Sequence, residues 1–159
     1  RDAMESRGLG DVYKRPPTTA LDVTVQAQIL NILNSLRKER KLSILFISHD
    51  FGVISQLCDR VIVMYAGSIV EEGPVKNIMQ QAAHPYTSEL IKCVPQLGNK
   101  EHALHSIPGN PPSLNQLPEG CAFANRCQYK QDQCLKGSVP VSSKDNRSYK
   151  CFYPVGGTA

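Results

Sequence analysis

The apolar residues of the chain follow two different patterns, with a change near residue 95. Up to that point apolar side chains recur at helical spacing in several stretches, and two short, continuous apolar runs lie between these stretches. After Pro95 the periodicity fades. The stretches with helical spacing are residues 22–41, 51–58, 74–82 and 84–94. This alternation of helices and strands predicts an α/β fold for the first part of the chain.

The two apolar runs predict β-strands. LSILFIS, residues 42–48, is continuous and rich in β-branched residues, which favours a strand buried on both faces, as in a parallel sheet. RVIVMY, residues 60–65, is followed by the turn AGS and then by IVEEG. We therefore expect residues 60–73 to form a β-hairpin at the edge of the sheet.

Aspartate and proline mark the expected helix starts. Asp22 and Asp50 precede the first two helices, where a carboxylate accepts hydrogen bonds from backbone N–H groups of the first turn. Pro74 and Pro85 stand at the first position of the last two helices, where the missing N–H of proline is not needed. Residues 22–94 are thus predicted to run helix, strand, helix, strand, strand, helix, helix.

Composition and charge exclude several classes of protein. The chain has 159 residues, of which 41% are hydrophobic, enough for one compact domain with a small appendage. The 18 Lys and Arg exceed the 14 Asp and Glu only slightly, so nucleic acid is not an expected partner. The sequence lacks both an apolar run of the ~18–20 residues that span a membrane and an apolar secretory signal. We expect a soluble protein in a reducing compartment.

Four cysteines follow a segment rich in proline and glycine, IPGNPPSLNQLPEG, which predicts a linker or an extended strap. Their spacing is C-x5-C-x6-C-x16-C, in a region with too few apolar residues to order itself by burial, so a cross-link is expected. Structural zinc sites usually show C-x2–4-C pairs, and wider gaps suit a [4Fe–4S] cluster. Spacing alone leaves an iron–sulfur cluster, zinc and free thiols open. The cysteines are Cys121, Cys127, Cys134 and Cys151.

The remaining cysteines are expected to be structural, and the histidines other than His49 could be spare ligands but are more simply interpreted as turn or exposed residues. Cys58 and Cys93 lie on apolar helix faces and are interpreted as small core residues. His84 belongs to the turn HPYT, whereas His102 and His105 lie in a polar stretch and are expected to face solvent.

Five motifs occur in a fixed order: PTTALDVTVQAQIL, LFISHD, DRVIVMYAGSIVEEGPV, HPYTSELI and IPGNPPSL. Together they resemble the C-terminal half of the ATP-binding subunits of oligopeptide, dipeptide and nickel ABC importers, from about Pro17 to Cys151. An apolar strand ending in His-Asp is common to most ABC ATPases. HPYT followed by the proline-rich strap and spaced cysteines is typical of the peptide-importer branch.

The resemblance implies a domain division. Residues 17–95 would be the C-terminal part of a P-loop ABC-type ATPase domain, and residues 96–159 a small, irregular, cysteine-rich extension. Residues 1–16 are interpreted as a leader or a non-native remnant. The intact subunit would bind ATP and Mg²⁺, pair with a second ATP-binding subunit as a homo- or heterodimer, and power a membrane permease from the cytoplasmic face of the membrane, without a transmembrane segment of its own.

The resemblance also assigns roles to single residues. Asp22 would be the acidic residue of the D-loop, which lies across the dimer interface. His49 would be the switch histidine, whose imidazole donates a hydrogen bond to the γ-phosphate of ATP. The family carries Asp-Glu, for Mg²⁺ and the attacking water, where this chain has Arg15 and Pro16. The sequence also lacks a GxxxxGK[ST] loop and an LSGGQ-type signature, so the chain is expected to be inactive as an ATPase by itself.

Some peptide-importer subunits carry a CxFxxRC motif followed by two further cysteines that hold a [4Fe–4S] cluster. This pattern carries over to Cys121, Cys127, Cys134 and Cys151, with Arg126 either near the anionic cluster or simply solvated. Two hypotheses follow. The chain is part of a peptide-import ATPase subunit with an iron–sulfur site, or it is a non-catalytic zinc or iron–sulfur module on an α/β scaffold.

Overall fold

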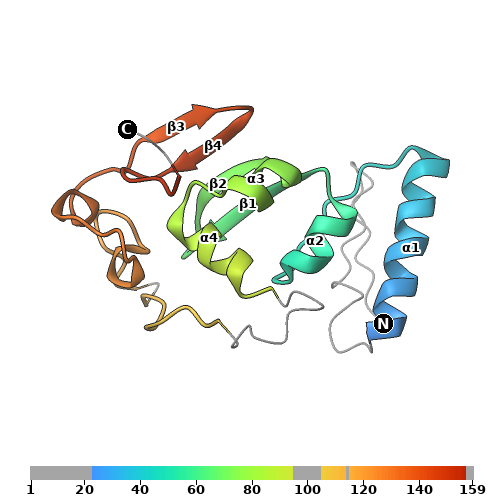
Figure 1. Ribbon diagram of the computed structural model, residues 1–159, viewed down its shortest axis with the longest axis horizontal. Helices are drawn as coiled ribbons and strands as arrows, with labels where there is room; N and C mark the ends of the chain where they lie inside the picture. The colour runs from blue at the N-terminus through green and yellow to red at the C-terminus, as the bar shows by residue number, and fades with distance from the viewer. Residues whose placement is uncertain (1–22, 95–104, 114, 157–159) are drawn as a thin grey trace. The chain divides into compact units, whose positions relative to one another are not determined.

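The computed structural model describes residues 23–94, 105–113 and 115–156 (Figure 1). The chain divides into two compact units, residues 1–49 and residues 50–159. Asp22, Arg15, Pro16 and His102 lie outside the described residues, so the role predicted for Asp22 stays a prediction. Within the described part of the chain, helices long and apolar enough to cross a membrane are absent.

The first unit contains helix α1, Val23–Arg40, as predicted. Arg37, Lys38 and Arg40 lie in its last turn, where cations face the negative end of the helix dipole. Lys41 adopts a left-handed conformation with φ 52°, and the N–H of Leu42 donates to the carbonyl of Arg37 at 3.1 Å, which ends the helix.

The prediction of a buried strand at residues 42–48 is wrong. This segment has no strand or helix assignment, and its apolar side chains are largely exposed, with Leu45 at 88% and Ile47 at 68%. A strand needs a neighbouring strand to pair its backbone N–H and C=O groups. Among the described residues no strand pairs with this segment, so its apolar composition alone does not make it one.

The second unit begins with helix α2, Phe51–Leu57, capped as predicted by Asp50, whose Oδ1 accepts the N–H groups of Gly52 at 2.8 Å and Val53 at 3.3 Å. The elements that follow are strands β1 (Arg60–Tyr65) and β2 (Ser68–Pro74), helices α3 (Val75–Gln81) and α4 (Pro85–Lys92), the 3₁₀ turns η1 (Ala124–Arg126) and η2 (Asp132–Leu135), and strands β3 (Val141–Lys144) and β4 (Arg147–Lys150).

Strands β1 and β2 form the predicted hairpin, with Tyr65 opposite Ser68. Ala66 and Gly67 both have positive φ, 47° and 79°, which suits the twist of a two-residue hairpin turn. Along β1, buried and exposed side chains alternate, so that Val61, Val63 and Tyr65 face the core. The register shifts between Val63 and Met64, which leaves one extra residue on β2.

Pro85 lies at the start of α4 as predicted, whereas the prediction for Pro74 is off by one residue. Pro74 is the last residue of β2 and the N-cap of α3, with extended backbone (ψ 131°), and α3 begins at Val75. The pairing of Arg60 with Pro74 keeps this proline in the strand ladder, where its fixed φ is also allowed.

Strands β3 and β4 were not predicted. They form a hairpin around Asp145 and Asn146, both with positive φ (54° and 58°). The sheet order is β1-β2-β4-β3 with all pairs antiparallel, so the described sheet is antiparallel and not parallel as expected (Figure 1). Strands from both sides of the predicted boundary at residue 95 share this sheet, and the boundary itself stays a prediction.

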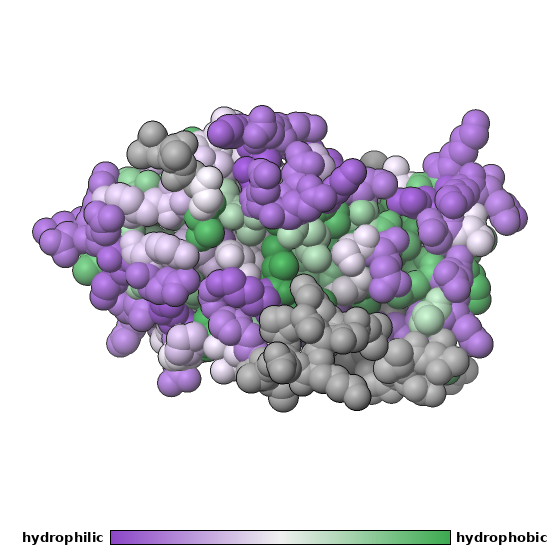
Figure 2. Space-filling view, in the orientation of Figure 1, coloured by the Kyte–Doolittle hydropathy of each residue, from purple (hydrophilic) through white to green (hydrophobic). Residues whose placement is uncertain are grey.

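Helix α3 packs against the β1–β2 hairpin and contacts α2 and α4. The fully buried Ile78 of α3 lies in this core, together with Val53 and Leu57 of α2 and Val63 of β1. On the other face of the hairpin Ile62 and Met64 are more than half exposed. Apolar side chains also reach the surface between polar ones on the face shown in Figure 2.

Candidate functional site

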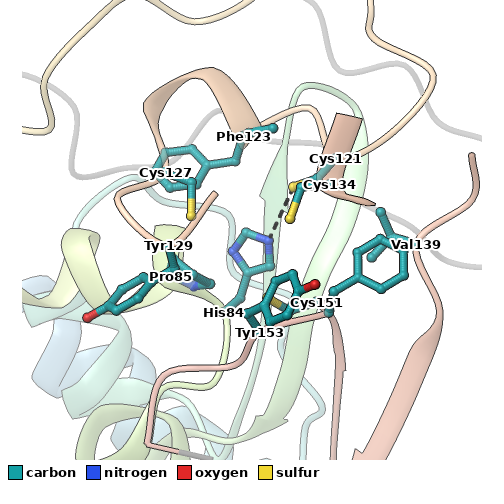
Figure 3. A pocket seen from close by; sticks show the side chains of 12 residues that line it. His84, Pro85, Cys121, Phe123, Cys127, Tyr129, Cys134, Val139, Cys151 and Tyr153 are labelled. Atoms are coloured by element: carbon teal, nitrogen blue, oxygen red, sulfur yellow. Dashed lines mark hydrogen bonds between the residues drawn. The ribbon is translucent and has the colours of Figure 1, made fainter. Parts of the chain in front are cut away.

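The four cysteines of the C-terminal region line one pocket of the second unit (Figure 3). They come from different local structures: Cys127 ends the turn η1, Cys134 lies in η2, and Cys151 directly follows β4. Figure 3 shows their side chains around the imidazole ring of His84. The residues that line the pocket are His84, Pro85, Cys121, Phe123, Ala124, Cys127, Tyr129, Cys134, Val139, Cys151, Phe152 and Tyr153.

Backbone contacts hold the two turns together. The N–H of Cys121 donates to the carbonyl of Cys134 at 2.8 Å, and the N–H of Cys127 donates to the carbonyl of Ala124 at 3.2 Å. Gly120 makes the first contact possible, because a Cβ at this position would lie 2.3 Å from the carbonyl oxygen of Cys134. A residue larger than glycine would therefore push the two turns apart.

Phe123, between the first two cysteines, anchors this region to the rest of the second unit. Its side chain is 1% exposed, and its ring centroid lies 5.3 Å from the rings of both Tyr65 and Tyr86. Aromatic pairs at this separation stabilise packing beyond the area they bury. The cysteine region is thus docked on β1 and α4.

His84 projects into the pocket from the N-terminus of α4. It is 1% exposed, and its Nδ1 accepts a hydrogen bond from the N–H of Tyr86 at 3.1 Å, which caps the helix. Its Nε2 lies 4.0 Å from the sulfur of Cys121, the contact drawn in Figure 3.

A buried carboxylate, Glu71 of β2, fixes the backbone at this point. It is fully buried, and its two oxygens accept the N–H groups of Ala83 at 2.8 Å and His84 at 2.9 Å. The guanidinium of Arg147, on β4, lies 3.9 Å from Glu71 and also donates to the carbonyl of Gln81. A buried charge needs such partners, and here they tie β2, β4 and the turn before α4 together.

The side chain of Arg126 donates hydrogen bonds to backbone carbonyls at the start of the strap. Its Nε donates to the carbonyl of Pro108 and its Nη2 to that of Ile107, both at 2.9 Å, while Nη1 donates to the hydroxyl of Tyr65 at 3.3 Å. Arg126 is therefore not a simple solvated residue. His105 is exposed, as expected, and its Nε2 lies 2.6 Å from a carboxylate oxygen of Glu89.

Burial favours the neutral forms of three cysteines and one histidine of the pocket. It raises the pKa of the thiols of Cys121 and Cys127, and it raises the pKa of Cys151 to about 12. Burial also lowers the pKa of His84 to about 4, so the imidazole is neutral near pH 7. Thiolates bind metals, so Cys121, Cys127 and Cys151 could act as ligands only if the positive charge of the metal offsets the cost of burying their thiolates.

The pocket does not have the geometry of a single-ion site. Among the residues that the structure describes, no group of three or more His, Cys, Asp or Glu side chains is arranged to hold one metal ion. The free space between the side chains is about 10 Å³, roughly the room that one water molecule needs. A larger inorganic group would require the cysteine side chains to rotate outward.

The other predicted site residues lie elsewhere. His49 is exposed, at the end of the first unit and directly before the cap of α2. Cys58 and Cys93 are half-buried at the C-terminal ends of α2 and α4, so neither is a full core residue as expected. Glu71 and Arg147 were missed, because a lone charged residue in a strand carries no sequence signal of its partner.

The chain is similar to known ATP-binding proteins of peptide transport. Residues 70–134 match the family described as "Oligopeptide/dipeptide transporter, C-terminal region". The oligopeptide transport ATP-binding protein OppD of Salmonella typhimurium is 44% identical over 139 residues, which is 87% of this chain and 42% of the relative.

Two further ATP-binding proteins of peptide transport are similar to the chain. OppD of Haemophilus influenzae is 52% identical over 119 residues, 74% of this chain and 36% of the relative. The probable D,D-dipeptide transport ATP-binding protein DdpD of Escherichia coli is 45% identical over 139 residues, 87% of this chain and 42% of the relative. The chain thus spans well under half the length of these relatives, and it is similar to ATP-binding proteins of oligopeptide and dipeptide transport, with residues 70–134 matching the C-terminal region of that family.

Proposed function

We propose that the chain is part of an ATP-hydrolysing subunit that drives peptide import by an ABC transporter. The observation that carries this proposal is the similarity over 87% of the chain to proteins named as oligopeptide and D,D-dipeptide transport ATP-binding proteins. The intact subunit binds ATP and Mg²⁺, pairs with a second ATP-binding subunit, and contacts the membrane permease at the cytoplasmic face of the membrane.

His49 is the proposed contact to the γ-phosphate. It is exposed and directly precedes Asp50, whose carboxylate caps α2, so the start of this helix defines the backbone next to the imidazole. An imidazole N–H can donate to a phosphate oxygen, and such a contact contributes most where charge develops during hydrolysis. Asp22 is proposed to act at the dimer interface.

Peptide uptake by cells tests this role. In the full-length subunit, His49→Ala should abolish ATP-dependent uptake while the protein still assembles with its partners, and His105→Ala is the matched control with normal uptake. Normal uptake by the His49→Ala variant would contradict the proposal. The purified 159-residue chain, which has no phosphate loop, should not bind Mg-ATP.

We also propose that the pocket holds one [4Fe–4S] cluster through Cys121, Cys127, Cys134 and Cys151. A structural zinc ion is held by four ligands at about 2.0–2.3 Å from one point, whereas each thiolate of a cubane cluster binds a different iron atom. Four thiols line one pocket, and the gaps between them in the sequence are wider than those of usual zinc sites, which supports a cluster over zinc. When bound, the cluster supplies a four-point cross-link and a one-electron redox centre.

Anaerobic reconstitution with iron and sulfide tests the site. The chain should become brown with broad visible absorbance, and replacing any one of the four pocket cysteines by serine should lower cluster content several-fold. Cys93→Ser is the matched control, because Cys93 does not line the pocket. A colourless protein that binds one zinc ion per chain would contradict the cluster and favour a zinc module.

A further inference from the structure

The imidazole ring of His84 is held in one orientation. Its backbone N–H donates to Glu71 at 2.9 Å, its Nδ1 accepts from the N–H of Tyr86 at 3.1 Å, and its ring lies 6.0 Å from that of Phe123 between centroids. The carbonyl of the preceding Ala83 accepts the N–H of Val155 at 2.8 Å, so the turn is fixed on its other side as well. This ring is placed by the fold and does not depend on the cysteines for its position.

These contacts also determine which nitrogen carries the proton. A backbone N–H only donates, so Nδ1 of His84 must be the acceptor, and the single proton of the neutral ring is on Nε2. Nε2 is the atom that lies 4.0 Å from the sulfur of Cys121. An N–H donor is therefore directed at one of the four thiols.

We propose that His84 donates a hydrogen bond from Nε2 to the sulfur of Cys121 and thereby raises the reduction potential of the iron–sulfur cluster, an inference that rests on the cluster proposed above. A thiol is a weak acceptor, and 4.0 Å is a long contact. A metal-bound thiolate is a stronger acceptor than a thiol, so a hydrogen bond from Nε2 should be stronger to the ligated sulfur than to the free thiol. Hydrogen bonds to the sulfurs are among the factors that set cluster potentials, because they offset negative charge that increases on reduction.

Two substitutions separate this role from helix capping. In His84→Asn the amide oxygen can accept the N–H of Tyr86 as an N-cap, but the shorter side chain lacks a donor near Cys121. In His84→Gln the amide nitrogen lies close to the position of Nε2, so the donor is kept and the cap is lost. We expect a more negative midpoint potential with near-normal stability for His84→Asn, and a near-normal potential with lower stability for His84→Gln.

The experiment is a potentiometric titration of the reconstituted full chain, with urea unfolding of the same samples. A merely structural role predicts the opposite pattern, in which the potential follows stability and His84→Gln shifts it at least as much as His84→Asn. That result, or an unchanged potential in His84→Asn, would overturn the inference.

A spectroscopic measurement on the wild-type chain keeps the inference testable if the variants lose the cluster. With the cluster assembled in a chain whose histidine rings carry nitrogen-15, electron–nuclear double resonance of the reduced state should detect a weak coupling to one histidine nitrogen, as an N–H···S contact requires, which separates this contact from backbone N–H groups. A strong coupling from iron-bound imidazole, or no coupling to a histidine nitrogen, would overturn the inference. A wild-type chain that assembles no cluster would overturn the proposed function and this inference with it, whereas a cluster whose potential does not depend on residue 84 would overturn this inference alone.

Discussion

The two units of the molecule differ in how far their apolar side chains are buried. In the first unit Leu30 is the only described apolar side chain that is buried, and Leu45 and Ile47 are mostly exposed. In the second unit helices and strands bury a continuous set of apolar side chains around Ile78.

The difference shows that a short apolar run predicts a buried strand only where another strand is available to pair with it. Residues 42–48 and residues 60–65 both contain an apolar run, yet only RVIVMY forms a strand, because it has β2 to pair with and α3 to cover one face. The cysteine region has almost no periodic pattern, yet backbone pairing with β2, buried charges and Phe123 determine its position.

The largest expected effect comes from Glu71. Glu71→Ala removes the acceptor of two backbone N–H groups and leaves Arg147 buried without its carboxylate partner, which should lower the free energy of unfolding by about 3–5 kcal/mol. The matched control is the neighbouring Glu72, which accepts a hydrogen bond from Ser148 and is less buried. Glu72→Ala should lower the free energy of unfolding by only about 1 kcal/mol. Equal losses in urea unfolding would contradict the role given to Glu71.

A second pair of substitutions compares the two units directly. Ile78→Ala, at a fully buried position, should cost about 2–5 kcal/mol because it leaves a cavity in the core. Leu45→Ala, at a position 88% exposed, should change the free energy of unfolding by no more than about 0.5 kcal/mol. A large loss for Leu45→Ala in the same unfolding assay would mean that residues 42–48 are buried after all.

Arg126→Ala should release the strap from the cysteine region. The substitution removes the donors to the carbonyls of Ile107 and Pro108, so it should lower the free energy of unfolding by about 1–3 kcal/mol. Proteolytic cleavage within residues 105–113 should also become faster. Arg126→Lys should fall between alanine and wild type, because an ammonium group cannot bind both carbonyls in the same fixed geometry. Lys130→Ala is the surface control. Unchanged cleavage in Arg126→Ala would show that the strap is held by other contacts.

The smallest expected effect is a pH dependence at Glu89. Burial opposes ionisation of this carboxyl, but hydrogen bonds from Lys92 and His105 outweigh it and lower its pKa from the ordinary 4.5. A carboxyl with a lowered pKa in the folded state stabilises the protein above its ordinary pKa, and this contribution is lost as the pH falls through the lowered value. The partners are partly exposed, so we expect only a few tenths of a kcal/mol.

Acid unfolding curves test this effect. Glu89→Gln should be slightly less stable than wild type near pH 6, and the difference should vanish below the lowered pKa of Glu89. A difference that persists or grows in acid would contradict the assignment.

The sequence predicts the local features well. Helix spacing, the Asp50 cap, the hairpin turn at Ala66 and Gly67 and the start of α4 at Pro85 all depend on residues close in the chain, and all are confirmed. The β3–β4 hairpin had a local signal, since Asp145 and Asn146 are residues that tolerate positive φ and flank short stretches of strand-forming residues.

The parts that could not be predicted depend on contacts between distant residues. The pairing of Glu71 with Arg147 and the approach of His84 to Cys121 join positions that no local pattern connects. The prediction that four cysteines act together followed from their spacing and from the family resemblance, and the structure places all four on one pocket. Which inorganic group they hold, and the roles of Asp22 and His49, stay predictions.

The central claim is that the four thiols of this pocket bind one [4Fe–4S] cluster, and native mass spectrometry of the anaerobically reconstituted chain tests it most directly. We predict that the main species carries the added mass of one [4Fe–4S] cluster and that this mass is lost in the Cys134→Ser variant but kept in Cys93→Ser. A main species with a single zinc ion, or with no added mass, would contradict the account.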